Sequence, residues 1–204
     1  MGNIVQMLAA HKRENKGIVR VAFGDLPEEY SVIPNIIWVR PPFGTIGHVS
    51  EKVSCLISAT PCAQNGENVV VQVAEPVEKS GLRAFEYLDT NEPPPIISRT
   101  LTCIGTRLDA ALSVVGVTPD KLRGWSLDLD LNGGEADALI GLGDYINCFD
   151  SIFVRAFNYS PYKDAPSIVD IRKVVERHAF RPRYMYFAPG IGNHYWALKL
   201  GDGK

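Results

Sequence analysis

Cysteine is scarce in this sequence, and the arrangements that build disulfide scaffolds or zinc sites are missing. Cys55, Cys62, Cys103 and Cys148 are spread over 204 residues. No two of them form a CxxC pair, and no cysteine lies in a tight cluster with histidine. A disulfide framework and a structural zinc site are therefore not expected. We expect reduced thiols, no metal ion and no cofactor.

The sequence also lacks a strong charge of one sign, long apolar runs and the common catalytic motifs. A net charge of −2 argues against a dedicated binder of duplex DNA. No apolar run approaches the ~20 residues that span a bilayer, and the start lacks the apolar core of a secretory signal, so we expect a cytoplasmic protein. GxSxG, P-loop, dinucleotide-binding and HExxH motifs are absent, which favours binding or structural work over catalysis.

The apolar residues that are present, 46% of the chain, are arranged mostly at strand periodicity. Leu127, Leu129 and Leu131 alternate with polar residues after Trp125 in the clearest example. Strands are expected at 18–23, 36–39, 53–59, 69–73, 82–88, 97–103, 125–131, 151–159, 184–188 and 195–200, and helices at 108–115, 134–146 and 168–179. Strands gather early, helices come late, and no regular βαβ alternation is visible. The predicted fold class is therefore α+β with antiparallel sheets.

The predicted organisation is a short arm followed by one body. Residues 1–16 form a flexible N-terminal arm, because an apolar stripe gives way to basic residues and Gly17 ends it. Residues 17–204 form a β-rich α+β domain, with a possible joint between two small subdomains near 116–124.

Two motifs invite a chemical interpretation. Residues 128–133 match the first half of a calcium-binding EF-hand loop, but Leu139 occupies the position of the bidentate glutamate. The simpler interpretation is a strand whose aspartates, Asp128 and Asp130, face water. His194 follows all four cysteines in the chain, as in cysteine hydrolases in which a strand-borne histidine acts as the base.

Charge is distributed unevenly along the chain. Acidic residues outnumber basic ones in 121–150, whereas basic residues prevail in 161–204 and follow the N-terminal stripe. Such basic regions suit an anionic lipid surface, and Gly2 opens an incomplete myristoylation motif with Gln6 at its sixth position. The candidate membrane-binding residues are Gly2, Ile4, Leu8, Lys12, Arg13 and Lys16 in the arm, and Arg172, Lys173, Arg177, Arg181 and Arg183 near the C-terminus.

The order of elements in the last quarter of the chain resembles the C-terminal part of matrix proteins of negative-strand RNA viruses. The resemblance is carried by the aromatic strand at 151–157, the amphipathic helix at 168–179 and the aromatic strand at 195–200. The late-domain PPxY motif common in such proteins is missing. The resemblance implies a β-rich virion protein that assembles beneath a membrane.

We therefore expect a non-enzymatic structural protein that self-associates on the cytoplasmic face of a membrane. Its expected partners are further copies of itself, an anionic lipid membrane and a viral nucleocapsid. One alternative is a Cys/His-dependent hydrolase that uses His194. The other is a viral coat protein that binds RNA; nucleic acid is a possible partner but is less favoured because of the net charge.

Overall fold

The computed structural model describes residues 16–43, 51–85, 94–156, 162–188 and 191–199. The strands are β1 (Gly17–Ala22), β2 (Ile36–Arg40), β3 (Val53–Ser58), β4 (Thr60–Pro61), β5 (Asn68–Glu75), β6 (Ile96–Thr106), β7 (Trp125–Asp130), β8 (Phe149–Ala156), β9 (Phe180–Ala188) and β10 (Ile191–Lys199). The helices are α2 (Leu108–Val114), α3 (Glu135–Leu142) and α4 (Ile168–Glu176), with 3-10 turns η1 (Glu28–Val32), η2 (Val77–Lys79), η3 (Pro119–Leu122) and η4 (Gly143–Cys148).

The described residues form a seven-stranded sheet with the order β3-β2-β1-β7-β8-β10-β9. Five neighbouring strands, from β3 to β8, are parallel, and β10 runs antiparallel between β8 and β9. The predicted antiparallel α+β class is therefore wrong, and the protein has a mixed α/β fold. The expectation failed because the described parts of the β1–β2 and β2–β3 connections contain no α-helix, so the sequence shows no βαβ alternation.

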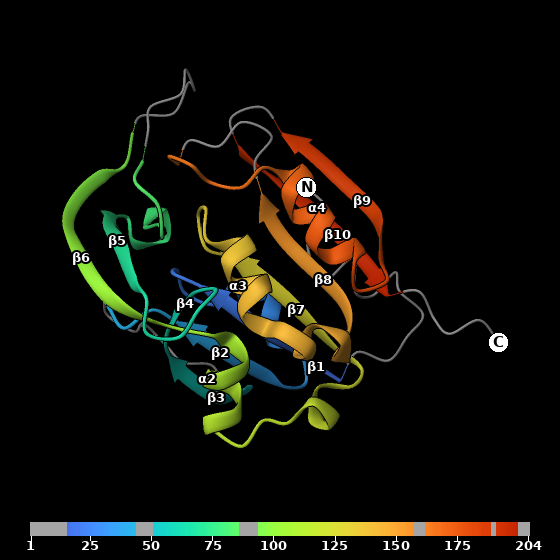
Figure 1. Ribbon diagram of the computed structural model, residues 1–204. Coiled ribbons are helices and arrows are strands. Elements are labelled where there is room, and N and C mark those ends of the chain that lie inside the picture. Colours follow the sequence, from blue (N-terminus) through green and yellow to red (C-terminus); the bar gives the residue numbers. More distant parts are fainter. Residues whose placement is uncertain (1–15, 44–50, 86–93, 157–161, 189–190, 200–204) are drawn as a thin grey trace.

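A second, three-stranded sheet of order β4-β6-β5 is inserted between β3 and β7. It lies beside the helical layer of the main sheet (Figure 1). The expected strand at 82–88 is wrong over its described residues. Phe85 makes only an isolated bridge to Tyr162, and Gly81 makes another to Gln72; residues 86–88 lie outside the described part.

The helices α2, α3 and α4 lie on one face of the main sheet, as Figure 1 shows. Val19, Val21, Leu127 and Leu129 point to this face and are fully buried. The predicted helix at 168–179 is present as α4, which begins with a reciprocal cap between Ser167 and Asp170. The strand periodicity thus identified the face of β1 and β7 that forms the main core.

The opposite face of the sheet is also buried along its centre. Ile18, Ile36 and Trp38 have no exposed surface and pack with Tyr30 and Ile33, which belong to or follow η1. The prediction that the aspartates of the 125–131 strand face water is therefore wrong for Asp128, which is 7% exposed. β7 is a central parallel strand and is covered on both faces.

The helix expected at 134–146 is divided in two. The α-helix α3 ends at Leu142, and Gly143, with φ of 50°, leads into the 3-10 turn η4. A turn follows β7, where Asn132 and Gly133 both have positive φ. None of the helices in the described residues has the length and apolar character needed to cross a bilayer.

Candidate functional site

The strand order of the main sheet reverses its direction of growth between β1 and β7. From β1 the chain proceeds outward through β2 and β3, then returns to place β7 and β8 on the other side of β1. In open α/β sheets, ligands bind beyond the carboxyl ends of the strands at this switch point. The candidate site is therefore the edge where β1, β2, β7 and β8 end.

A buried ionic network joins β1 to β7 close to this edge. The Arg20 guanidinium donates to the Asp128 carboxylate and, at 3.2 Å, to the Tyr30 hydroxyl, which itself donates to Asp128. Burial lowers the pKa of Arg20, but Asp128, Tyr30 and Asp130 together outweigh that effect and raise it. Burial, together with Asp128, raises the pKa of Tyr30. Arg20 therefore stays charged and Tyr30 stays a hydrogen-bond donor at neutral pH.

Asp130, the last residue of β7, extends this network to β8. Its carboxylate accepts hydrogen bonds from Arg20 Nη2 at 3.4 Å and from Arg155 Nη1 at 3.3 Å. About a quarter of each side chain in the Asp130–Arg155 pair is exposed. Burial lowers the pKa of Arg155, but Asp130, Tyr162 and Glu135 together outweigh that effect and raise it. This pair is therefore the part of the network that a ligand at the edge can reach.

The loop after β7 is held by a buried glutamate. Glu135 is 3% exposed, and its two carboxyl oxygens accept the backbone N–H groups of Leu131 at 2.9 Å and Gly133 at 3.0 Å. Burial raises the pKa of Glu135 to about 7, although these N–H donors lower it. Burial also raises the pKa of nearby Tyr162. Glu135 titrates near neutral pH. Because both of its oxygens accept backbone N–H groups, its main role is to hold the loop after β7 in place.

The turn η2, which follows β5 of the inserted sheet, packs against the same edge. Asn132 Nδ2 donates to the carbonyl oxygens of Glu78 at 2.8 Å and Ser80 at 2.7 Å. A Cβ atom on Gly24, which follows β1, would lie 2.9 Å from Glu78 Cβ. The η2 segment therefore rests on the loop after β1. No glycine-rich loop follows β1, and β2 ends in Arg40, where a dinucleotide-binding sheet commonly carries an acidic residue.

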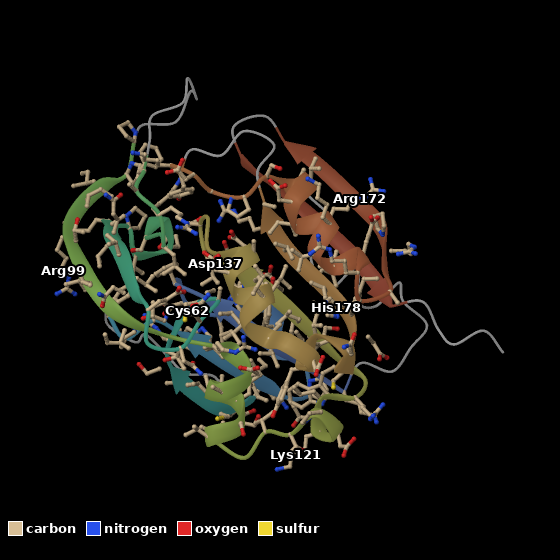
Figure 2. The ribbon with its side chains drawn as sticks, in the orientation of Figure 1. Cys62, Arg99, Lys121, Asp137, Arg172 and His178 are labelled. Atoms are coloured by element: carbon tan, nitrogen blue, oxygen red, sulfur yellow. The ribbon has the colours of Figure 1, made fainter. Side chains whose placement is uncertain are left out.

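A pocket of about 370 Å³ lies between the inserted sheet and α3. Figure 2 shows Cys62 and Asp137 in this region. Asp137 forms an ion pair with Arg83, and burial raises its pKa. Burial also raises the pKa of the Cys62 thiol to about 11, and its Sγ donates to the Gln64 carbonyl at 3.0 Å. Cys62 is therefore a protonated thiol at neutral pH rather than a ready nucleophile.

Four of the predicted C-terminal basic residues do come together. Arg172, Lys173 and Arg177 from the α4 region and Arg181 from β9 line one shallow hollow, which we call the basic surface; Figure 2 labels Arg172 on it. Glu176 and Pro182 complete its lining. Arg177 and Arg181 form no ion pair within the described part of the chain. The structure therefore gathers residues that are up to nine positions apart in the sequence.

The remaining predicted residues fall mostly outside the described part. Gly2, Ile4, Leu8, Lys12 and Arg13 belong to residues 1–15, and the side chains of Arg183 and His194 are likewise not described. Lys16 is exposed; its backbone N–H donates to the Gly124 carbonyl at 3.0 Å. Cys55, Cys103 and Cys148 are half-buried and pack against the core. No cluster of three metal-ligating side chains occurs among the described residues.

Sequence reasoning considered Asp128 and Asp130 only as part of a calcium loop or as aspartates that face water, and it missed the other residues at the carboxyl edge, namely Arg20, Tyr30, Arg40, Glu135, Arg155 and Tyr162. The available signal was an arginine inside each of three apolar strands. A charged residue in a strand that is buried on both faces needs a partner or a ligand. The antiparallel assignment hid this signal, because one face of an antiparallel sheet commonly faces water and a charged side chain there needs no partner.

No family model, no curated protein and no solved structure matches this chain.

Proposed function

We propose that this protein binds an adenosine-containing cofactor at the carboxyl edge of its parallel sheet and uses it for group transfer. The observation that carries the proposal is the switch point between β1 and β7. The partly exposed Asp130–Arg155 pair lies at this edge, together with Glu135 and Tyr162, whose pKa values are raised by burial. Such clusters are common at binding and catalytic sites.

The far edge of the sheet sharpens the choice of cofactor. β10 runs antiparallel between β8 and β9, and β9 is parallel to the other five strands. This order, with one reversed strand next to the last parallel strand, is the arrangement of methyltransferases that use S-adenosylmethionine. The comparison is an analogy of fold, and it makes S-adenosylmethionine the first compound to test.

The Asp130–Arg155 pair would bind and orient ligand groups in such a site. Asp130 offers a carboxylate that can accept hydrogen bonds from ribose or acceptor hydroxyls, and Arg155 and Arg20 fix its orientation. Arg155 in turn offers a cation to an anionic acceptor. When bound, S-adenosylmethionine would supply a methyl group from its sulfonium to a nucleophilic atom of the acceptor; the acceptor would lose a proton and the cofactor would become a thioether.

Thermal unfolding with S-adenosylmethionine, AMP and NAD tests the proposal. A bound cofactor at 100 times its Kd adds about 2.7 kcal/mol of stability. We expect S-adenosylmethionine to raise the melting temperature of the wild type and of Arg123→Gln, a control at an exposed arginine. Arg155→Gln, in which Asp130 keeps its bond to Arg20, is expected to lose most of the rise. If none of the three compounds raises the melting temperature of the wild type, the proposal is wrong.

The basic surface supports a second proposed function, association with an anionic membrane as part of a self-assembling viral matrix layer on the cytoplasmic side. Each well-placed Lys or Arg contributes about 1 kcal/mol to binding at such a membrane. Arg177→Ala with Arg181→Ala should weaken co-sedimentation with phosphatidylserine vesicles at least tenfold, whereas Lys121→Ala should not. Equal binding by both variants contradicts this function. Binding to RNA without binding to vesicles favours the RNA-binding alternative.

A further inference from the structure

Arg40 is a buried arginine without a carboxylate partner. It ends β2 and is 3% exposed. Its guanidinium carbon lies 5.1 Å from the centre of the Trp38 ring, and Nη2 donates to the Phe43 carbonyl over a long 3.4 Å. Nη1 has no hydrogen-bond partner among the residues that the structure describes. None of the ion pairs within the described residues includes Arg40.

The arginines on two other strands of the sheet, β1 and β8, have carboxylate partners. Arg20 on β1 is almost as buried, and Asp128 and Asp130 compensate its charge. Arg155 on β8 is paired with Asp130. A buried charge that lacks a partner strongly destabilises a fold. The position of Arg40 therefore points to a negative charge that the described chain does not supply.

Two further buried groups near Arg40 also lack hydrogen-bond partners in the described part of the chain. They are the Trp38 indole Nε1 and the Thr60 hydroxyl. Trp38 lies under the Arg40 guanidinium, and Arg40 is paired with Ser58 across the β2–β3 ladder, two residues before Thr60. The Ala59 N–H donates to the Arg40 carbonyl at 3.0 Å, which fixes this corner. The carboxyl ends of β2 and β3 therefore hold three unused groups, each able to donate a hydrogen bond.

We infer that Arg40, Trp38 and Thr60 form an anion-binding site that holds a phosphate group. Phosphate fits because it accepts several hydrogen bonds and carries the charge that Arg40 lacks. The site adjoins the switch point, since Val39 pairs with Val21 and both strands end there. In nucleotide-binding sheets, an arginine near this position accommodates a phosphate on the ribose.

The phosphate can come from either of two sources. It belongs to the substrate on which S-adenosylmethionine acts, or, if the adenosine-containing cofactor is a phosphorylated nucleotide instead, it is the phosphate on the ribose of that nucleotide. Only this choice of source rests on the proposed function; the anion site itself rests on the three unpartnered donors. Adenosine 2′-monophosphate, AMP and inorganic phosphate as probes separate the two sources.

The test uses thermal unfolding of the full chain at constant ionic strength with inorganic phosphate in place of chloride. Phosphate should raise the melting temperature of the wild type and of Arg123→Gln, a control at an exposed arginine. Arg40→Met should lose the response, because a charge-assisted hydrogen bond of this kind changes affinity about tenfold or more. Tighter binding of adenosine 2′-monophosphate than of AMP, lost in Arg40→Met, assigns the phosphate to a nucleotide; equal binding of the two assigns it to the substrate.

Thr60→Val provides the second test, because it removes a hydroxyl while keeping the shape of the side chain. It should weaken the phosphate response even if Arg40→Met does not fold. A wild type that does not respond to phosphate overturns the inference, and so does an unchanged response in Thr60→Val or in folded Arg40→Met. A phosphate response without any response to S-adenosylmethionine, AMP or NAD removes the proposed cofactor and leaves the anion site in place.

Discussion

The two faces of the central sheet are both buried, but they are stabilised by different means. On the helix-covered face, Leu127 and Leu129 pack among apolar side chains and have no exposed surface. On the opposite face, the neighbouring Asp128 is buried in hydrogen bonds with Arg20 and Tyr30. Packing tolerates substitution by degrees, whereas a buried ion pair fails when either partner is removed. Adjacent residues of β7 are therefore sensitive to substitution for different reasons: Leu127 through lost apolar packing, and Asp128 through the loss of a charged partner.

The largest expected effect is at Asp128. Asp128→Ala leaves the buried Arg20 charge without its closest partner and should reduce the free energy of unfolding by about 3–5 kcal/mol. Urea denaturation at pH 7 measures this change. The double variant Arg20→Met with Asp128→Leu removes both charges and should recover most of the loss. If Asp128→Ala has the stability of the wild type, the two faces do not differ as described.

The apolar face provides the matching substitution. Leu127→Ala removes a fully buried side chain and should reduce the free energy of unfolding by about 2–5 kcal/mol, through lost burial and a cavity. Unlike the ionic face, this face should accept Leu127→Met at a cost below about 1.5 kcal/mol. Denaturation curves for both variants test the contrast, which fails if the methionine is as disruptive as the alanine.

Glu135 is a buried carboxylate held by backbone N–H groups rather than by arginine, and it should make stability depend on pH. Its pKa is about 7 in the folded protein against 4.5 when unfolded. The folded state binds the proton more tightly, so this contribution is complete below pH 4.5 and is lost as the pH rises through 7. The loss is about 3 kcal/mol. The pH dependence of unfolding should therefore be flatter over this range in Glu135→Gln, and identical slopes would contradict it.

Gly141 tests how closely the helix-covered face is packed. Alanine usually stabilises a helix by about 1 kcal/mol relative to glycine. Here a Cβ atom would overlap the Cys62 carbonyl oxygen, so Gly141→Ala should instead destabilise the protein by about 1–3 kcal/mol. Ile140→Ala, at a half-exposed neighbour, is the control and should change stability far less. A stabilising Gly141→Ala would show that the α3–β4 contact is loose.

The smallest effect on stability is expected at a solvent-exposed ion pair. Arg123 and Asp120 lie 3.2 Å apart and are mostly exposed. Arg123→Ala should change the free energy of unfolding by about 0.5 kcal/mol or less. Thermal unfolding at low and high salt checks this value. A cost near that of Asp128→Ala would remove the distinction between buried and exposed pairs.

The sequence by itself determined most strand positions, helix α4 with its cap, and the face of β7 that enters the main core. These features are local, because a period of two or 3.6 residues and a capping pair are visible within a few positions. The excess of basic residues in 161–204 also indicated a basic surface near the C-terminus. That four of these residues lie together depends on the packing of α4 beside β9.

Only the tertiary structure decided the direction of the strands and the partners of the charged residues. Arg20 and Asp128 are 108 positions apart and meet because β1 and β7 are parallel neighbours. Strand direction depends on crossovers, and those between β1, β2 and β3 lack an α-helix in their described residues. An arginine in an apolar strand has the same sequence pattern whether it meets an aspartate, like Arg20, or remains unpaired, like Arg40. The difference lies in which strand becomes its neighbour.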